Sequence, residues 1–347
     1  MEQSGHDRAT TPGGLCVKAG VIIALFVGLA VATGLVLHFG WHNVIDAALA
    51  VGWRGAAALV GIYLVCLLIC ALSLQAVILD APNNSIVVCL WVRWLRESIG
   101  NLIALLPTAG EIAGARELTF YGVRPGMAGA STIVDLTMEL LSQILFTLFG
   151  LALLLTWYQD MEIGPWLVSG VAVSILAAAG FILAQGKGLF RLLERLPESL
   201  DLNWAWTVLP DAEGIHAGIQ SIYRHHKRVL SSGGLHLAGW VVGAGEAWVG
   251  LWFMGHALAW SDVLILESIA FALRTAAFIV PSRLGVQEAG YVLLGALFGL
   301  SPDVALALSL LKRGREIATG VPCLIIWQGM EGRRLWWRLA ARNRPGE

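Results

Sequence analysis

A polar break containing a proline interrupts a long apolar stretch towards the C-terminal end of this chain. It reads Val280-Pro281-Ser282-Arg283-Leu284-Gly285-Val286-Gln287-Glu288-Ala289-Gly290. A similar break occurs earlier and reads Leu106-Pro107-Thr108-Ala109-Gly110-Glu111-Ile112-Ala113-Gly114. Each break is followed by a long apolar segment that carries charged residues. Broken apolar segments at matching places in two halves of a chain are the best sequence indication of a transport site.

The two breaks belong to a candidate internal repeat. A single constant shift along the chain aligns Glu111 with Glu288, Gly122 with Gly299, Pro125 with Pro302 and Glu139 with Glu316. Each half then consists of a broken segment followed by a long apolar segment with an acidic residue at the same relative position. We therefore expect two structurally related halves.

The composition is typical of a polytopic membrane protein. Hydrophobic residues make up 57% of the 347 residues and charged residues only 14%, whereas a soluble domain carries about 25% charge. A formal net charge of -1 argues against a nucleic-acid partner, because such proteins usually have a basic surface. The five cysteines have no CxxC spacing, so they predict neither a metal site nor a redox site.

Six stretches are long enough to cross a bilayer, which takes about 20 apolar residues. They are 18–38, 53–79, 126–157, 165–185, 232–257 and 303–328. The apolar stretch 86–122 contains the first break, and the stretch 261–300 contains the second. Each of these two stretches could form either a pair of spans or one re-entrant helical hairpin.

The distribution of basic residues predicts the orientation. The loop 186–230 and the tail 329–347 are rich in arginine, so both are expected in the cytoplasm by the positive-inside rule. The two broken stretches then face opposite sides of the membrane. The predicted fold class is thus all-α, a polytopic integral membrane protein with about six full spans plus two re-entrant helical hairpins in an inverted repeat. The predicted divisions are a cytoplasmic N-terminal segment (1–17), a first membrane half (18–185), cytoplasmic amphipathic helices (186–230), a second membrane half (231–328) and a basic cytoplasmic tail (329–347).

The candidate transport site consists of ionisable residues in and after the two breaks. Such residues are costly inside an apolar segment and are functional candidates for that reason. Helix N-terminal ends at the tips of the hairpins bind anions, and a guanidinium suits a phosphate or carboxylate. The candidates are Glu111, Arg116, Asp135, Glu139, Arg274, Arg283, Gln287, Glu288, Lys312, Arg313, Arg315 and Glu316, with hairpin breaks at Pro107, Gly110, Pro281 and Gly285.

A structural alternative remains open for the same residues. The pairs Glu111–Arg116 and Glu288 with Arg274 or Arg283 could be ion pairs that hold the hairpins in place. The histidines, among them His216 and His236, have no ligand spacing. No catalytic, nucleotide-binding or metal motif is present. We therefore predict no cofactor, no metal and no enzymatic activity.

Several motifs resemble those of the flippase-like membrane domain family, named after the membrane half of lysylphosphatidylglycerol synthases. They are Leu106-Pro107-Thr108-Ala109-Gly110-Glu111, Gly114-Ala115-Arg116, Arg274-Thr275-Ala276-Ala277-Phe278-Ile279-Val280-Pro281, Leu284-Gly285-Val286-Gln287-Glu288-Ala289-Gly290, Leu310-Leu311-Lys312-Arg313-Gly314-Arg315-Glu316 and Ile326-Trp327-Gln328. The resemblance covers about 15–335 and is nearest to the hopanoid-biosynthesis-associated branch. It implies two re-entrant hairpins in an inverted repeat and movement of a lipid between leaflets.

The chain also departs from this family in two ways. Arg283 places a base where a small residue is expected. The aminoacyl-transferase domain of the synthases does not follow the last predicted span, so the resemblance does not extend to aminoacyl transfer.

The predicted function is a lipid flippase or transporter of the bacterial cytoplasmic (inner) membrane, with both termini in the cytoplasm. Its cargo is expected to be a hopanoid, a hopanoid-related lipid or an anionic phospholipid. Two alternatives remain: a non-catalytic scaffold that binds lipid-biosynthesis proteins through 186–230, and a lipid-modifying membrane enzyme. The expected partners are membrane lipids.

Overall fold

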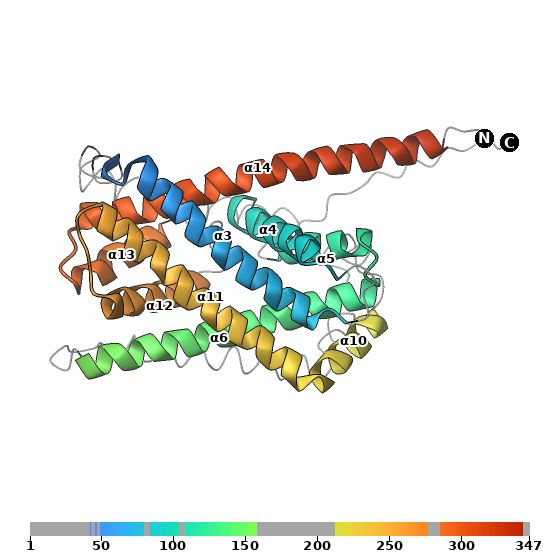
Figure 1. The fold of residues 1–347 in the computed structure, drawn as a ribbon, viewed down its shortest axis with the longest axis horizontal. Helices are drawn as coiled ribbons and strands as arrows, with labels where there is room; N and C mark the ends of the chain where they lie inside the picture. Colours follow the sequence, from blue (N-terminus) through green and yellow to red (C-terminus); the bar gives the residue numbers. More distant parts are fainter. Residues whose placement is uncertain are drawn as a thin grey trace, which may run out of the picture.

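The computed structural model describes residues 42, 46, 49–79, 84–103, 108–157, 212–276 and 285–342. These residues form nine α-helices and no strand, as expected for the all-α class (Figure 1). The helices are α3 (Gly52–Val77), α4 (Ile86–Leu102), α5 (Ala109–Phe120), α6 (Pro125–Trp157), α10 (Ala212–Arg224), α11 (His226–Phe253), α12 (Trp260–Ala276), α13 (Val286–Ala296) and α14 (Pro302–Arg342). The expected segment 1–17, the expected spans 18–38 and 165–185, and the residues Pro107, Pro281 and Arg283 lie outside the described residues.

Two groups of four helices follow one another in the same order and with similar lengths. In α3–α6 and again in α11–α14, a long helix precedes two short helices and a second long one. The first short helices, α4 and α12, both have 17 residues. The second short helices, α5 and α13, have 12 and 11 residues. The aligned residues of the sequence repeat thus lie in equivalent elements.

The turn before the last helix of each group has the same construction. Gly122 and Gly299 have φ values of 88° and 72°, a left-handed conformation that is costly for residues with a Cβ atom. Three residues later, Pro125 and Pro302 begin α6 and α14. Proline is well tolerated at the first helical position, because its missing N–H would have no partner there.

The helices α3 and α11 lie side by side and run in opposite directions (Figure 1). A side chain at Gly55, near the start of α3, would touch Phe253 at the end of α11. At the opposite end of the pair, the Ser73 and Ser232 Oγ atoms are 2.7 Å apart. Since these two helices hold equivalent places in the two groups, the groups meet in an antiparallel arrangement.

The short helices pack against the long helix of the opposite group. Trp94 of α4 donates from Nε1 to the carbonyl oxygen of Thr319 of α14, at 3.1 Å. In the same way, Gln143 of α6 donates from Nε2 to the carbonyl oxygen of Phe271 of α12, at 3.1 Å. These reciprocal contacts interlock the two groups, so that neither one packs as a separate body.

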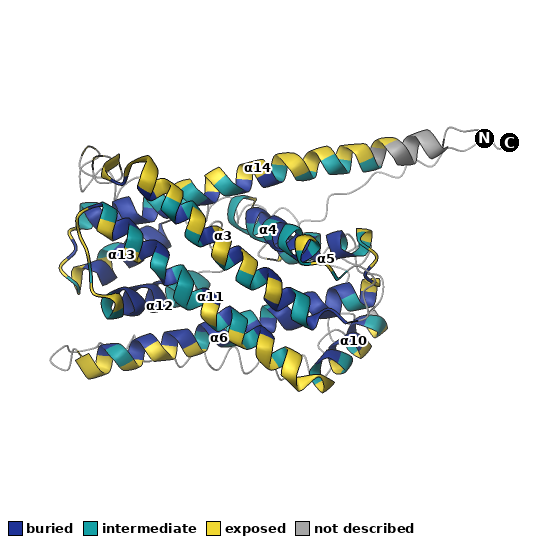
Figure 2. Ribbon diagram, in the orientation of Figure 1, coloured by how far each residue is buried: buried dark blue, intermediate teal, exposed yellow. Residues whose placement is uncertain are grey.

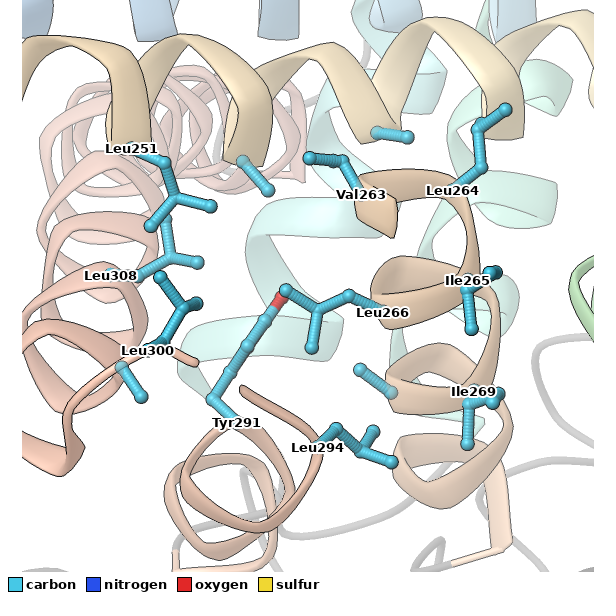
Figure 3. Close-up of a cluster of buried hydrophobic side chains, with 14 of the residues drawn as sticks. Leu251, Val263, Leu264, Ile265, Leu266, Ile269, Tyr291, Leu294, Leu300 and Leu308 are labelled. Atoms are coloured by element: carbon cyan, nitrogen blue, oxygen red, sulfur yellow. The ribbon is translucent and has the colours of Figure 1, made fainter. Parts of the chain in front are cut away.

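An apolar core joins α11, α12, α13 and α14. Leu251, Leu266, Tyr291 and Leu308 are among its fully buried side chains (Figure 3). Figure 2 shows exposed positions along the long helices. Many of them carry large apolar side chains, such as Leu64. Meanwhile many ionisable side chains are buried among the described residues. Large exposed apolar side chains together with paired ionisable side chains in the interior suit a lipid environment.

Two described helices, α3 and α6, are long and apolar enough to cross a membrane by length and composition. They coincide with the expected spans 53–79 and 126–157. The stretches expected at 232–257 and 303–328 are helical too, but α11 is rich in glycine and α14 carries four charged residues between Lys312 and Glu316. Both features lower the hydropathy, so the predicted count of six spans stays a prediction.

The boundaries of α10, α11 and α14 differ from the expected divisions. Helix α11 begins at His226, within the stretch expected as a loop to 230. Helix α14 continues to Arg342, well into the expected tail. Helix α10 is amphipathic as predicted, and its buried isoleucines belong to a core cluster shared with α6. The remaining part of 186–230, up to 211, lies outside the described residues.

Candidate functional site

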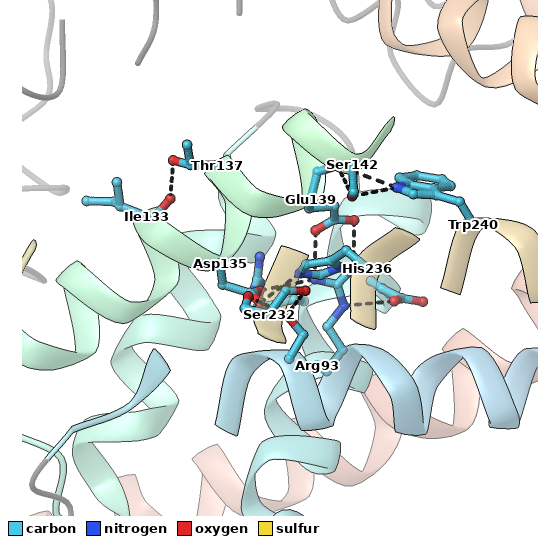
Figure 4. A network of polar contacts seen from close by, with 12 residues as sticks. Arg93, Ile133, Asp135, Thr137, Glu139, Ser142, Ser232, His236 and Trp240 are labelled. Atoms are coloured by element: carbon cyan, nitrogen blue, oxygen red, sulfur yellow. Dashed lines mark hydrogen bonds and ion pairs between the residues drawn. The ribbon is translucent and has the colours of Figure 1, made fainter. Parts of the chain in front are cut away.

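A buried group of ionisable side chains lies between α4, α6 and α11, and we call it the first charged cluster (Figure 4). It consists of Arg93, Arg96, Glu97, Asp135, Glu139 and His236. The three α4 residues are spaced so that they share one helix face, and the two α6 residues are four positions apart. Helix spacing therefore explains how each element supplies its part, and packing of the elements brings the parts together.

Arg93 holds α4 against α6. Its Nη2 and Nη1 atoms lie 2.7 and 2.8 Å from the two carboxylate oxygens of Glu139. Its Nε donates to Glu97 one turn further along α4, at 3.0 Å. This two-pronged arrangement is the strongest kind of protein ion pair. Since all its nitrogens are engaged, we regard Arg93 as a structural tie.

Asp135 is the centre of the cluster and is 0% exposed. Its Oδ2 accepts from Arg96 Nη1 at 2.7 Å, and its Oδ1 accepts from His236 Nε2 at 2.9 Å. Ser73 donates to the same Oδ1 at 3.1 Å. A buried carboxylate is tolerated only when its charge and its lone pairs are matched, and here three helices supply the match.

Arg96 differs from Arg93 because one of its donors has no partner. Its Nε is buried and without a hydrogen bond among the described residues, although the side chain is only 3% exposed. Helix α5 presses closely on this arginine through two glycines. A Cβ atom at Gly110 would overlap the Arg96 carbonyl, and one at Gly114 would overlap the Arg96 side chain. The structure thus keeps a guanidinium with an unused N–H in the interior.

A second charged cluster lies between α12, α13 and α14, and comprises Glu267, Arg274, Tyr291, Lys312 and Glu316. Lys312 Nζ lies 2.6 Å from Glu267 Oε2, and Tyr291 donates to Glu267 Oε1 at 2.7 Å. Both Glu267 and Lys312 are almost completely buried. The Lys312 ammonium also lies 5.4 Å from the centre of the Tyr291 ring, a favourable cation–π distance.

The tip of the second broken stretch is organised by Glu288. Its carboxylate accepts from the backbone N–H of Gly285 at 2.8 Å and pairs with Arg313 of α14. Gly285 has φ 80°, which favours glycine. The predicted alternative pairing of Glu288 with Arg274 is wrong, because Arg274 is paired with Glu316 on α14, at 3.4 Å. The alternative with Arg283 lies outside the described residues.

Gln287 lies beside Glu288 and is also buried. Its amide Nε2 donates to Ser309 at 3.0 Å, while its Oε1 has no partner among the described residues. Arg315 points elsewhere, since it forms two hydrogen bonds of 2.9 and 3.2 Å with Glu246 of α11. The charged residues of α14 thus connect this helix to α11, α12 and α13.

The predicted pair of Glu111 and Arg116 is not formed. Residues five apart on a helix point about 140° away from each other, so the two side chains leave α5 on different faces. Glu111 lies in the first turn of α5, and its buried Oε2 has no partner among the described residues. Arg116 lies instead 2.8 Å from Glu331 of α14.

Arg116 is part of a contact that we call the α5–α14 clamp, formed by Arg116, Glu117, Phe120, Glu331 and Arg334. Arg334 makes two hydrogen bonds of 2.7 and 2.8 Å to Glu117 and lies over the Phe120 ring at 3.9 Å. Partial burial raises the pKa of Glu331, but hydrogen bonds from Arg116 and Arg334 outweigh it, and the pKa lies below its usual value. The clamp attaches the C-terminal part of α14 to α5.

Several members of the two clusters were not among the residues predicted from the sequence. They are Arg93, Arg96, Glu97, His236 and Glu267. Each is an ionisable residue within an apolar stretch, so the rule that selected Asp135 and Glu139 could have found them as well. His236 was set aside for lack of metal-ligand spacing, yet its partner is a carboxylate from another helix, which spacing along the chain does not reveal.

Asp135, Glu139 and His236 could geometrically surround a metal ion, since one ligand atom from each lies within 4.8 Å of the others. The carboxylate oxygens concerned already accept from Arg93 and Arg96. A metal ion would face two guanidinium groups at short range and would have to displace them. The chemistry of this group therefore fits ion pairing and does not fit a metal site.

The comparisons with known proteins agree with a membrane protein. No curated protein and no solved structure matches the chain. Residues 20–322 match the family described as the lysylphosphatidylglycerol synthase TM region, and this match suggests a function related to membrane lipids. Because it covers most of the chain, the protein belongs to the lysylphosphatidylglycerol synthase transmembrane region family.

Proposed function

We propose that this protein moves a lipid with an anionic head group between the leaflets of the bacterial cytoplasmic membrane. The buried Arg96, whose Nε has no partner in the described part of the chain, carries this proposal. A guanidinium in an interior of low dielectric binds a phosphate or carboxylate strongly. The head group would pass through the protein next to Arg96 while the acyl chains stay in the lipid.

The proposal includes two re-entrant hairpins, α4–α5 and α12–α13. Each of these four helices is shorter than the roughly 20 residues that a full span requires. The antiparallel contact of α3 with α11 supports an inverted repeat, in which the hairpins reach the interior from opposite sides. Alternating access of this kind commonly uses inverted repeats and broken helices.

The proposed orientation follows from the basic residues at the junction of α10 and α11. Arg224, Lys227 and Arg228 would lie in the cytoplasm by the positive-inside rule. Since α3 is antiparallel to α11, the end of α3 is then cytoplasmic, and the α4–α5 hairpin is reached from the cytoplasm. The α12–α13 hairpin is reached from outside, and α14 returns its C-terminal end to the cytoplasm.

The test is leaflet exchange in liposomes that contain the purified protein. Fluorescent phosphatidylglycerol, phosphatidylcholine and a hopanoid would be compared as probes. We expect exchange of phosphatidylglycerol, and we expect Arg96→Lys to reduce it at least about tenfold, because lysine keeps the charge but loses the planar fork. The matched control is Arg54→Lys at an exposed position, which should leave exchange unchanged.

The same experiment separates the alternatives. Exchange of the hopanoid alone, without any effect of Arg96→Lys, would favour a hopanoid cargo and contradict the anionic head group. If a folded protein exchanged none of the lipids, this result would contradict the transport function and favour the scaffold alternative. In that case the α10 surface, and not the charged clusters, should be the part sensitive to mutation. Chemical modification of a probe would indicate a lipid-modifying enzyme.

A further inference from the structure

The hydrogen-bond network around His236 connects three helices at the centre of the first charged cluster. Its Nε2 donates to Asp135 Oδ1, and Ser73 donates to the same oxygen. Ser73 is in turn 2.7 Å from the Oγ of Ser232, one turn before His236 on α11. A carboxylate only accepts hydrogen bonds, so Nε2 keeps its hydrogen whether the ring is neutral or charged. Gain or loss of a proton by this ring therefore takes place at Nδ1.

The net charge of the first charged cluster depends on whether His236 carries that proton. From α6 the ring faces Asp135 and Glu139; from α4, the cluster contributes Arg93, Arg96 and Glu97. From α3 the thiol of Cys70 lies beside the imidazole. On the remaining part of α11, Glu246 is paired with Arg315 of α14 and lies almost three turns away. The cluster thus has three carboxylates and two guanidinium groups, and a protonated His236 brings its total charge to zero.

An anionic head group beside Arg96 changes this balance. With a neutral His236 the cluster already has one excess negative charge, and the head group adds a second. With a protonated His236 only the charge of the head group remains. Uncompensated charge is expensive in an interior of low dielectric, so the proton and the anion favour each other's binding. By thermodynamic linkage, each raises the affinity for the other by the same factor.

On this basis we propose that His236 is the proton carrier of the transport cycle, and that one proton bound at its Nδ1 accompanies each anionic head group across the membrane. The inference rests on the proposed function and adds the coupling ion to it. Asp135 acts as a positioning residue, because it fixes the orientation of the imidazole and the nitrogen that keeps its hydrogen. The proton is taken up on the loading side and released with the lipid on the other.

The test measures exchange of fluorescent phosphatidylglycerol in liposomes with the protein in a single orientation, under opposite pH gradients and with the membrane potential clamped. For the unmodified protein, we expect the two gradients to change the exchange rate in opposite directions, by a ratio of about 5 to 150, the usual range of coupling between two ligands. In His236→Gln this ratio should fall to one. The matched control is His225→Gln, at an exposed position beside α10, which should keep the full ratio.

A second measurement does not depend on a variant that folds. The unmodified protein in weakly buffered detergent should take up protons when short-chain phosphatidylglycerol is added, most strongly at the pH where a titration shows His236 half protonated, and phosphatidylcholine should cause no uptake. Exchange that ignores the gradient, or lipid binding without proton uptake, would overturn the coupling and leave the proposed function intact. Absence of exchange under every gradient would instead refute the proposed function itself.

Discussion

Two arginines only three positions apart illustrate how geometry, at the scale of single residues, assigns different roles to the same side chain. Arg93 uses all its nitrogens on carboxylates of α4 and α6. Arg96 engages Asp135, but its Nε has no partner among the residues that the structure describes. Helix α5 faces Arg96 with two glycines, which pack against its backbone and its side-chain carbons and offer no side-chain acceptor to Nε. Arg93 is therefore a structural residue that holds α4 against α6, whereas Arg96 is a candidate binding group.

Gly114 is the residue on which this close approach depends most directly. We expect Gly114→Ala to destabilise the protein by about 1–3 kcal/mol, the usual cost of forcing extra volume into a packed interior. The added Cβ would overlap the Arg96 side chain and touch Val92. The change in unfolding free energy can be measured by chemical denaturation in detergent. The control is Gly100→Ala in the same hairpin, where no atom lies within 4 Å of the new Cβ and alanine should even stabilise the helix slightly.

The candidate site could be predicted in part at this scale. Asp135 and Glu139 were identifiable because buried charge is rare in apolar segments and because their spacing places them on one helix face. The same rule could have selected Arg93 and His236, but their pairing with these carboxylates could not be predicted, since they reach them from α4 and α11. The sequence shows which residues share a face within one helix, whereas contacts between helices depend on packing.

At the scale of the elements, the α5–α14 clamp shows how a helix can serve two environments. The first part of α14 packs in the apolar core, and its end carries Glu331 and Arg334 to the first hairpin. The clamp is partly exposed to solvent, so its ion pairs are individually weak. Its strength lies in the combination of two-pronged pairing with the stacking of Arg334 over Phe120.

The clamp should open in acid. Because the pKa of Glu331 is lower in the folded protein than its ordinary value of 4.5, this residue stabilises the clamp fully above that value. The contribution is lost as the pH falls through the lowered pKa. A spin label at Gly332→Cys should become more mobile, by electron paramagnetic resonance, as the pH falls through this lowered pKa.

Two arginine variants test the same clamp at neutral pH. Arg334→Gln should make the label mobile, whereas its exposed neighbour Arg333→Gln should not. A label that stays immobile in acid and in Arg334→Gln would contradict the assigned contacts.

The elements were predicted unequally well. The long, largely apolar sequences of α3 and α6 gave bounds within two residues of those observed, because a helix that crosses lipid needs such a stretch. Helix boundaries that contain charged residues were harder to predict. The second membrane half was predicted to begin at 231, whereas α11 begins at His226, since a helix that leaves the apolar layer loses its apolar pattern but keeps its backbone hydrogen bonds.

For the whole molecule, the antiparallel contact of α3 with α11 and the reciprocal packing of short and long helices are the main features. The repeat could be suspected from aligned glycines, prolines and glutamates. Its interlocked packing could not be predicted. Nothing in the sequence pattern indicates that α4 contacts α14 in addition to its neighbours along the chain. The equivalent turns at Gly122 and Gly299 now provide a direct test of the inverted arrangement.

Arg124 and Ser301 occupy equivalent positions just before α6 and α14, and both are exposed. If the repeat is inverted, cysteines at Arg124→Cys and Ser301→Cys should react with a membrane-impermeant maleimide from opposite sides. Labelling in intact cells and in inverted vesicles, in a background without the native cysteines, would measure this. Reaction from the same side in both variants would contradict the inverted repeat.

The unbroken course of α14 has a mechanical consequence. About 33 Å of helix separates Lys312 in the second cluster from Arg334 in the clamp, at 1.5 Å per residue. A tilt of about 10° around Lys312 would move Arg334 by about 6 Å, more than the length of any ion pair. The helix thus works as a lever with the clamp at its far end, and Pro322 lies midway as the place where it can bend. Any rearrangement around α12 and α13 must therefore either bend α14 at Pro322 or break the α5–α14 clamp.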